Sequence, residues 1–380
     1  MVYIKALKEA IKIEKMVFLF RIYFTFTRKE KIMAIVKLII ELISCLFFNG
    51  PIIYKCFMDK NNCETTRVFF ISFHAFAIIF DTWLIINCLV TSKTFIKFVK
   101  DVRSVHSYFK TDDDYERTLK RINIAFKVTY ITFWVLRITG SVAWKIYEKY
   151  QRTNSITSIV LFAWRLVLDT WVEHRHFVEN ISFAIYGIIL ATLLKFFRVH
   201  LNKLEKIMKL RSHHSTLKRA LKELIWIYKK LICCGKYMSF CFSVQILLRL
   251  SLSFINYIAF VTTSVQMLSE KKFLMLMDWR FLIIIGWNHI IMPYVVLAAS
   301  QKVHNEYISL TRALARFCNT SVKSDNMEAY KITRNFKDFI SRNPVQISLT
   351  QKLTIGMYLL PCFLSISISY TIVILQFHPL

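Results

Sequence analysis

The chain has 380 residues, a formal net charge of +28, 55% hydrophobic residues and a mean hydropathy of +0.42. A soluble nucleic-acid-binding protein of this charge would be richer in polar residues, and a soluble globule would expose many of the 33 phenylalanines to water. Helices surrounded by lipid reconcile the basic charge with the apolar composition. We therefore expect an all-α polytopic membrane protein with no nucleic-acid partner.

Residue spacing disfavours enzymatic and cofactor chemistry. The six glycines stand far apart, which excludes a G-x-G-x-x-G fingerprint and a phosphate-binding P-loop. The nine cysteines include no C-x-x-C pair, and only Cys56 and Cys63 are near enough in sequence to suggest a local disulfide, which stays open. The cluster Glu173, His174, His176 and Glu179 lacks a second motif, so we interpret it as a polar cap at the outer rim. We expect no cofactor, no metal and no enzymatic activity.

Residues 1–31 form a basic amphipathic segment. It carries eight lysines and arginines, and Ile4, Leu7 and Ile11 recur at helical spacing among them. The segment is too short and too basic for a full span. We expect an interfacial or re-entrant helix at a cytoplasmic N-terminus.

Seven apolar stretches are long enough to cross a bilayer as helices. They are residues 32–55, 68–90, 124–147, 176–199, 237–265, 280–300 and 353–377. An eighth stretch, 156–172, is short and carries Arg165 and Asp169, so we expect it to lie against the outer interface or within the bundle without crossing.

Charge distribution sets the predicted orientation. With seven crossings, 37 of the 52 basic residues fall in the connections on one side, together with the N-terminus. The positive-inside rule makes that side cytoplasmic and leaves the C-terminus extracellular, in a multi-pass protein of the plasma membrane. Many of these basic residues can meet anionic lipid headgroups.

The chain divides into a six-helix, ligand-sensing bundle at 32–300 and cytoplasmic helical extensions at 200–236 and 301–352. Apolar residues recur every three or four positions in both extensions, from Leu217 to Tyr228 and from Ala329 to Phe339. We expect a cytoplasmic anchor layer, in which these stripes pack on one another or on another subunit.

Ionisable residues within the expected spans require partners. Lys37 and Glu41 can pair locally at i, i+4 spacing. Asp81, Arg137 and Arg249 have no local partner, which implies either ion pairs between helices or a hydrated pocket.

The last span, 353–377, is the only one without a charged residue. Ser365, Ser369 and Gln376 share a helical face with Val373. An uncharged wall with hydroxyls at intervals suits a water-filled pore. The alternative is that these serines bond back to their own helix.

The ending of this span resembles a known signature. Residues Ser369, Tyr370, Thr371 and onward to Gln376 and Phe377 resemble the C-terminal motif of insect gustatory receptors, Thr-Tyr followed by five hydrophobic residues and Gln-Phe. Ser369 replaces the threonine, and Thr371 occupies a nominally hydrophobic position. Phe197, Asn202 and Leu204 resemble the end of that family's fourth span, and the length and the predicted topology agree across the whole chain.

The resemblance implies a tastant-gated, non-selective cation channel assembled as a homo- or hetero-tetramer with other gustatory receptors. Gln376 and Phe377 would form the outer gate of a central pore, and Tyr370 would pack behind it. Val373, Ser369 and Ser365 would line the wall below.

A ligand site is expected in the outer halves of the bundle, where aromatic and polar groups converge. The candidates are Trp144, Asn180, Asn256, Tyr257, Trp287, Asn288 and His289. The aromatic ones could equally be interfacial anchors. The outer halves are more aromatic and basic than carboxylate-rich, which favours bitter, plant-derived compounds over sugars.

Three rival classes remain. An insect odorant receptor is the nearest, and the C-terminal motif argues for the gustatory branch. A G-protein-coupled receptor would need an extracellular N-terminus, and its N-P-x-x-Y motif is approached only by Asn343 and Pro344, with Ile347 in the tyrosine position. A polytopic membrane enzyme would need converging reactive side chains, and the ten histidines are dispersed.

Overall fold

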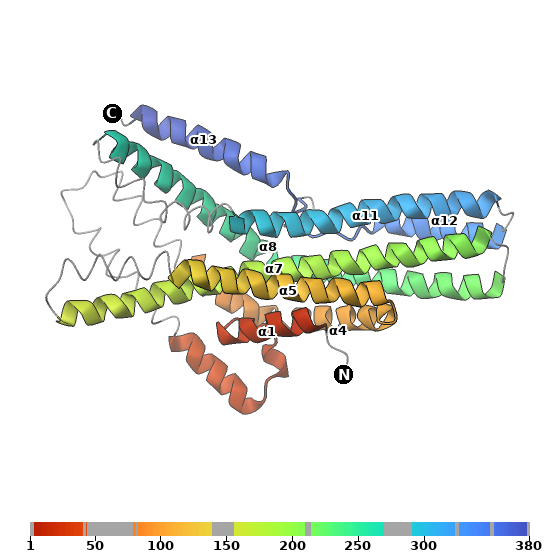
Figure 1. Ribbon diagram of the computed structural model, residues 1–380, viewed down its shortest axis with the longest axis horizontal. Coiled ribbons are helices and arrows are strands. Elements are labelled where there is room, and N and C mark those ends of the chain that lie inside the picture. Colours follow the sequence, from red (N-terminus) through yellow and green to blue (C-terminus); the bar gives the residue numbers. More distant parts are fainter. Residues whose placement is uncertain are drawn as a thin grey trace.

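The computed structural model describes residues 4–40, 43, 79–80, 82–138, 156–209, 214–269, 291–323, 327–349 and 353–377. These residues are almost entirely helical, and among them an isolated bridge between Ser348 and Thr354 is the only β-type pairing. The all-α class is thus confirmed for the described part of the chain. Figure 1 shows an elongated arrangement of long helices that lie roughly along one axis.

The labelled elements have the following bounds. They are α1 (Lys5–Met16), the 3-10 turn η1 (Tyr23–Thr25), α4 (Ser92–Phe109), α5 (Asp113–Arg137), α7 (Ile156–Lys209), α8 (His214–Ser269), α11 (Met292–Lys323), α12 (Met327–Arg342) and α13 (Leu359–Phe377). Residues 28–40 and 82–90 are helical as well.

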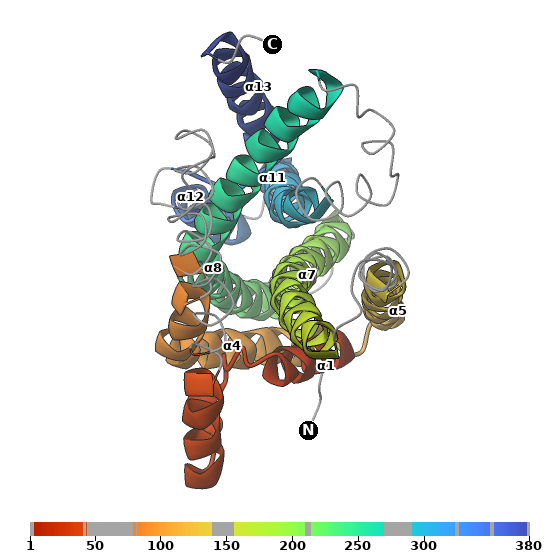
Figure 2. The same cartoon turned by 90° about the vertical axis from the view of Figure 1, so that its left-hand side faces the viewer.

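Helix α7 is the central element. Its 54 residues rise about 80 Å at 1.5 Å per residue, more than twice the thickness of a hydrocarbon layer of about 30 Å. In its span from Glu173 to Met208, the most apolar window is 94% buried. Helices α1, α5, α8 and α11 pack around it, as the view along the long axis shows (Figure 2). The apolar face of α7 therefore serves as the core of the bundle rather than as a lipid-facing surface.

Residues 156–172 belong to α7 and do not form a separate segment. Neither proline nor glycine occurs between residue 156 and Gly187 to end the helix, so the stretch at 156–172 continues without a break into the next expected span. A continuous helix crosses a membrane at most once, so residues 156–209 still count as a single crossing. The number of crossings on which the predicted orientation depends is therefore unchanged.

Two described helices are long and apolar enough to cross a membrane, Glu173–Met208 and Leu217–Ile255. A third would be the pair Thr82–Val90 and Ser92–Phe109, bent by 60°, if the two form one span. Parts of the spans expected at 32–55, 68–90, 124–147 and 280–300 lie outside the described residues. The count of seven and the sidedness of the termini stay predictions.

At one end of the molecule, α11, α12 and the ends of α7 and α8 run side by side (Figure 1). Their core includes ring contacts of Tyr228 with Phe336 at 5.8 Å and with Phe339 at 6.2 Å between ring centroids. Leu221, Leu224 and Phe336 are buried there. The amphipathic stripes of the sequence thus pack on one another within a single chain, which is the first of the two alternatives expected for them.

The N-terminal segment is part of the packed bundle. Helix α1 buries Ala6, Leu7 and Ala10, and it packs against α5 and α7. The chain then reverses through Phe18, which has a positive φ of 65°. A capping box, in which the side chains of Thr27 and Glu30 bind each other's backbone N–H groups, begins the helix at 28–40. The apolar face of α1 is therefore enclosed by the bundle.

Candidate functional site

Helix α13 carries the residues expected to line a pore, and it extends away from the bundle beside α8 (Figure 1). Tyr370 meets the Phe254 ring of α8 edge-on, with 5.7 Å between centroids. Ser367 is buried, whereas most of the helix is open. The exposed apolar side chains are Ile366, Ile368, Tyr370, Ile372 and Val373. An uncharged helix with this exposure needs lipid or other subunits around most of its circumference.

The predicted pore residues are exposed where their side chains are described. Ser365, Ser369, Val373 and Gln376 are all open on α13, and the Phe377 side chain lies outside the described residues. The Ser369 hydroxyl donates to the Ser365 carbonyl oxygen at 3.0 Å, so the back-bonding alternative applies to Ser369. Its hydroxyl oxygen can still accept a hydrogen bond from a passing water.

A buried junction of charges, not anticipated from the sequence, joins the N-terminal segment to α7 and α8. The guanidinium of Arg21 donates to Glu14 Oε1 at 3.0 Å, to Glu179 Oε1 at 3.3 Å and to the Gln245 side-chain oxygen at 3.2 Å. It also lies over the Phe242 ring, 4.1 Å from the ring centroid. Arg21 and Glu14 are 1% and 0% exposed. We call these four polar residues the Arg21 junction.

One signal in the sequence could have revealed this junction. Glu14 continues the apolar stripe of Leu7 and Ala10 at helical spacing, and a carboxylate on the buried face of a helix requires a buried cation. Arg21, seven residues later, entered the sequence analysis only as one of eight basic residues.

The cluster at 173–179 faces several partners within the bundle. Glu173 pairs with Arg137 at 2.6 Å, His174 meets the Tyr130 hydroxyl at 3.0 Å, and Glu179 belongs to the Arg21 junction. His174, His176 and Glu179 are buried, because helices pack around α7 on all sides at this level. Among the described residues, no three ligand-type side chains gather as a metal site would require.

The ionisable residues expected inside spans find partners on other segments. Arg137, whose side chain is 4% exposed, forms an ion pair with Glu173 of another helix. Arg249 interacts electrostatically with Glu179. The Lys37 ammonium lies 5.1 Å from the Phe18 ring centroid. Glu41 and Asp81, the other residues of this group, lie outside the described residues.

Of the expected ligand-binding residues, only Asn180 has a described side chain. It is buried, and its amide nitrogen has no hydrogen-bond partner within the described part of the chain. Asn256 and Tyr257 lie in α8 with undescribed side chains, and Trp144, Trp287, Asn288 and His289 lie outside the described residues.

Asn180 lies on α7 next to residues that contact other helices. Glu179 and Gln245 both accept from the guanidinium of Arg21, and His174 contacts the Tyr130 hydroxyl. Helix α7 begins at Ile156, well before the span expected at 176–199. The outer-half position of Asn180 stays a prediction.

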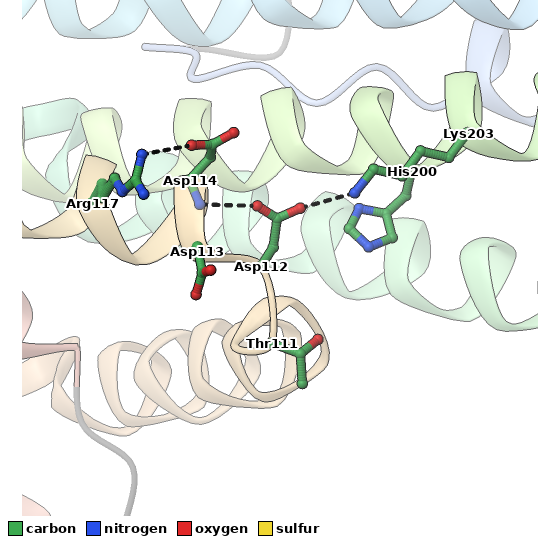
Figure 3. A pocket seen from close by; sticks show the side chains of 7 residues that line it. All are labelled: Thr111, Asp112, Asp113, Asp114, Arg117, His200 and Lys203. Carbon is green, nitrogen blue, oxygen red and sulfur yellow. Dashed lines mark hydrogen bonds and ion pairs between the residues drawn. The ribbon is translucent and has the colours of Figure 1, made fainter.

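A polar hollow of about 460 Å³ lies between the α4–α5 turn and α7 (Figure 3). It is lined by Thr111, Asp112, Asp113, Asp114, Arg117, His200 and Lys203. Asp112 caps α5 by accepting from the backbone N–H groups of Asp114 at 3.2 Å and Tyr115 at 3.3 Å. Lys203 of α7 donates to the other carboxylate oxygen at 3.1 Å.

Electrostatics explain the state of the Asp112 carboxyl. Partial burial acts to raise its pKa, but the hydrogen bond from Lys203 and those from the backbone outweigh it, so that the pKa is lowered. One carboxylate oxygen caps α5, and the other pairs with Lys203 of α7. The central carboxylate of the hollow therefore serves helix capping and helix packing.

The comparisons with known proteins bear on the fold. No family model matches the chain, and no curated protein matches it. One similar solved structure is the insect olfactory receptor OR5 from Machilis hrabei, with a TM-score of 0.63 and 12% identity over 97% of this chain and 99% of that chain. The same receptor in complex with eugenol gives a TM-score of 0.63 and 13% identity over 98% and 99%. The chain therefore has the fold of an insect olfactory receptor along nearly its whole length.

Proposed function

We propose that this chain is an insect gustatory receptor, a tastant-gated non-selective cation channel of the plasma membrane that serves taste signalling. The observation that carries the proposal is α13. It is an uncharged, largely exposed helix that ends in the Tyr370 to Phe377 motif, on a fold shared with an insect chemoreceptor.

The exposure of α13 supports assembly around a central pore. Within the described residues, the chain covers α13 chiefly on the side that faces α8. In a homo- or hetero-tetramer with other gustatory receptors, four such helices surround the axis, with Gln376 and Phe377 as the outer constriction. Val373, Ser369 and Ser365 line the path below, and Tyr370 rests against Phe254 of its own chain.

The proposed ligand is a small molecule, with bitter plant-derived compounds preferred to sugars. A receptor of the same fold has been solved with eugenol, which supports a small-molecule site in this architecture. Trp144, Asn256, Tyr257, Trp287, Asn288 and His289 stay the proposed lining. Asn180, buried on α7, belongs to the same proposed lining.

An olfactory receptor is the second candidate, because the similar solved structures are of an olfactory receptor. A calcium-influx screen of cells expressing the chain would separate the two functions. Bitter compounds, sugars and volatile odorants form its three arms. Responses to odorants alone would favour the olfactory assignment and contradict the gustatory one.

The gate assignment is tested by Gln376→Ala. Removing a polar side chain from the narrowest part of a pore should change the cation current and its selectivity, because ions lose a group that replaces their water. Whole-cell recordings with sodium and potassium substitution measure both quantities. Ser341→Ala, a hydroxyl deletion on the exposed face of α12, is the control. Identical currents and permeability ratios in Gln376→Ala and wild type would remove Gln376 from the gate.

A further inference from the structure

The segment between α12 and α13 is held along α8 by specific contacts. The Tyr228 hydroxyl donates to the Asn343 carbonyl oxygen at 2.9 Å, and the Ser348 backbone N–H donates to the Ser239 hydroxyl at 3.0 Å. Val345 and Ile347 are buried. Residues 343–348 therefore pack along α8.

The base of α13 is attached to a different helix, α11, through one side chain. The Gln301 side-chain oxygen accepts the backbone N–H of Met357 at 3.1 Å. Met357 lies two residues before the first residue of α13, and its own carbonyl oxygen accepts from Leu360 in the first turn of that helix. Gln301 thus satisfies a donor at the start of α13 in the way that an N-cap side chain does, but from another helix.

Glycine at position 356 makes this attachment sterically feasible. A Cβ atom at Gly356 would lie 2.7 Å from the Gln301 side-chain oxygen and 3.0 Å from the Tyr358 ring. Any larger residue would displace the amide from Met357. A second contact within α11 orients the Gln301 amide, because its side-chain nitrogen donates to the Asn305 side-chain oxygen at 2.9 Å.

Helix α11 is in turn packed closely on α7. Two residues before Gln301, Ala299 approaches Gly187 so closely that a Cβ there would lie 3.3 Å from the Ala299 methyl. A shift of α11 along α7 is therefore carried directly to Gln301. The central helix α7 and the helix proposed to line the pore are thus connected through α11 and this amide, in addition to the contacts that both make with α8.

We propose that Gln301 is a positioning residue for gating, a joint through which displacement of α11 against α7 moves the base of α13. This inference rests on the proposed channel function. Gln301 itself lies at the root of α13, and its role is to set the position of that helix while Gly356 leaves room for the contact.

The contact between Gln301 and Met357 is tested first by a measurement that does not depend on channel activity. Amide hydrogen exchange of the purified full-length receptor, followed by mass spectrometry, reports on the peptide that contains Met357 and the first turn of α13. Gln301→Leu and Gly356→Ala should each speed exchange there about fivefold, the effect expected for loss of one hydrogen bond. Gln301→Glu should keep wild-type protection, because a carboxylate oxygen can still accept from Met357. Unchanged exchange in Gln301→Leu would overturn the joint.

The coupling is tested by sodium conductance of the same proteins in liposomes, without added ligand. Gln301→Leu should change the open fraction with unaltered sodium-to-potassium selectivity, and Gln301→Glu should restore the wild-type value. Ser341→Ala, the exposed hydroxyl deletion on α12, is the control, because Ser341 contacts neither Gln301 nor the base of α13 in the described part of the chain. Faster exchange with unchanged conductance would overturn the gating role. If neither wild type nor any variant conducts, the channel proposal itself fails, while the exchange data still decide the joint.

Discussion

At the scale of single residues, the contribution of an ion pair to stability depends on its burial. Lys15 and Glu30 form a pair at 3.0 Å whose side chains are 47% and 44% exposed, whereas Arg21 and Glu14 form a pair at the same distance at 1% exposure each. Exposed pairs contribute about 0–1 kcal/mol. Breaking a buried pair leaves an uncompensated charge and costs about 3–5 kcal/mol.

The Arg21 junction yields a stability prediction. Arg21→Met leaves Glu14 and Glu179 buried without their shared partner, so we expect a large fall in the melting temperature of the purified receptor. Lys15→Met, in the same segment, should change it little. The double variant Arg21→Met, Glu14→Gln should recover part of the loss, because position 14 then carries no charge and Glu179 keeps its interaction with Arg249. Equal melting temperatures for Arg21→Met and Lys15→Met would contradict the junction's role.

At the scale of elements, helix ends depend on side chains that reach the terminal N–H groups. Asp112 both caps α5 and pairs with Lys203 of α7. Losing such a cap costs about 1 kcal/mol. A single carboxylate therefore both caps α5 and links the α4–α5 turn to the central helix α7.

We predict that Asp112→Ala loosens the first turn of α5, seen as faster exchange of the Asp114 and Tyr115 amides. Asp113→Ala, which removes an exposed neighbouring carboxylate, should leave these amides unchanged. The lowered pKa of Asp112 means that its contribution is complete above the unfolded value of 3.8 and is lost as the pH falls through the lower folded value. Protection that is unchanged from pH 6 to pH 2 would contradict this.

At the scale of the whole molecule, helices continue well beyond a membrane's thickness and pack into a second layer at one end. The described parts of the basic connections, in α4, at the ends of α7 and α8 and in α11 and α12, lie at or near that end (Figure 1). The positive-inside rule predicts that this end is cytoplasmic and that the end of α13 points to the outside.

Epitope tags test that orientation. In intact cells, an antibody should reach a tag fused after Leu380, and a tag placed before Met1 should stain only after permeabilisation. A cytoplasmic marker protein controls for leakage. The reverse pattern would agree with a G-protein-coupled receptor and overturn the predicted topology.

The sequence by itself determined the helical class, the length of the apolar stretches, the amphipathic stripes and the uncharged final span. These properties follow from composition and from local periodicity, which neighbouring residues set. The capping box at Thr27 and Glu30 is of the same local kind. The sequence also identified the C-terminal motif, although the gate and ligand residues stay predictions.

Only the tertiary structure decided which distant side chains meet. Arg21 with Glu179, Arg137 with Glu173, and Gln301 with Met357 are separated by 158, 36 and 56 positions, so no local pattern relates them. The net charge of +28, which indicated orientation, contained no information on the few charges that the bundle encloses. Their positions are set by packing, since a buried charge is tolerated only where another segment supplies its partner.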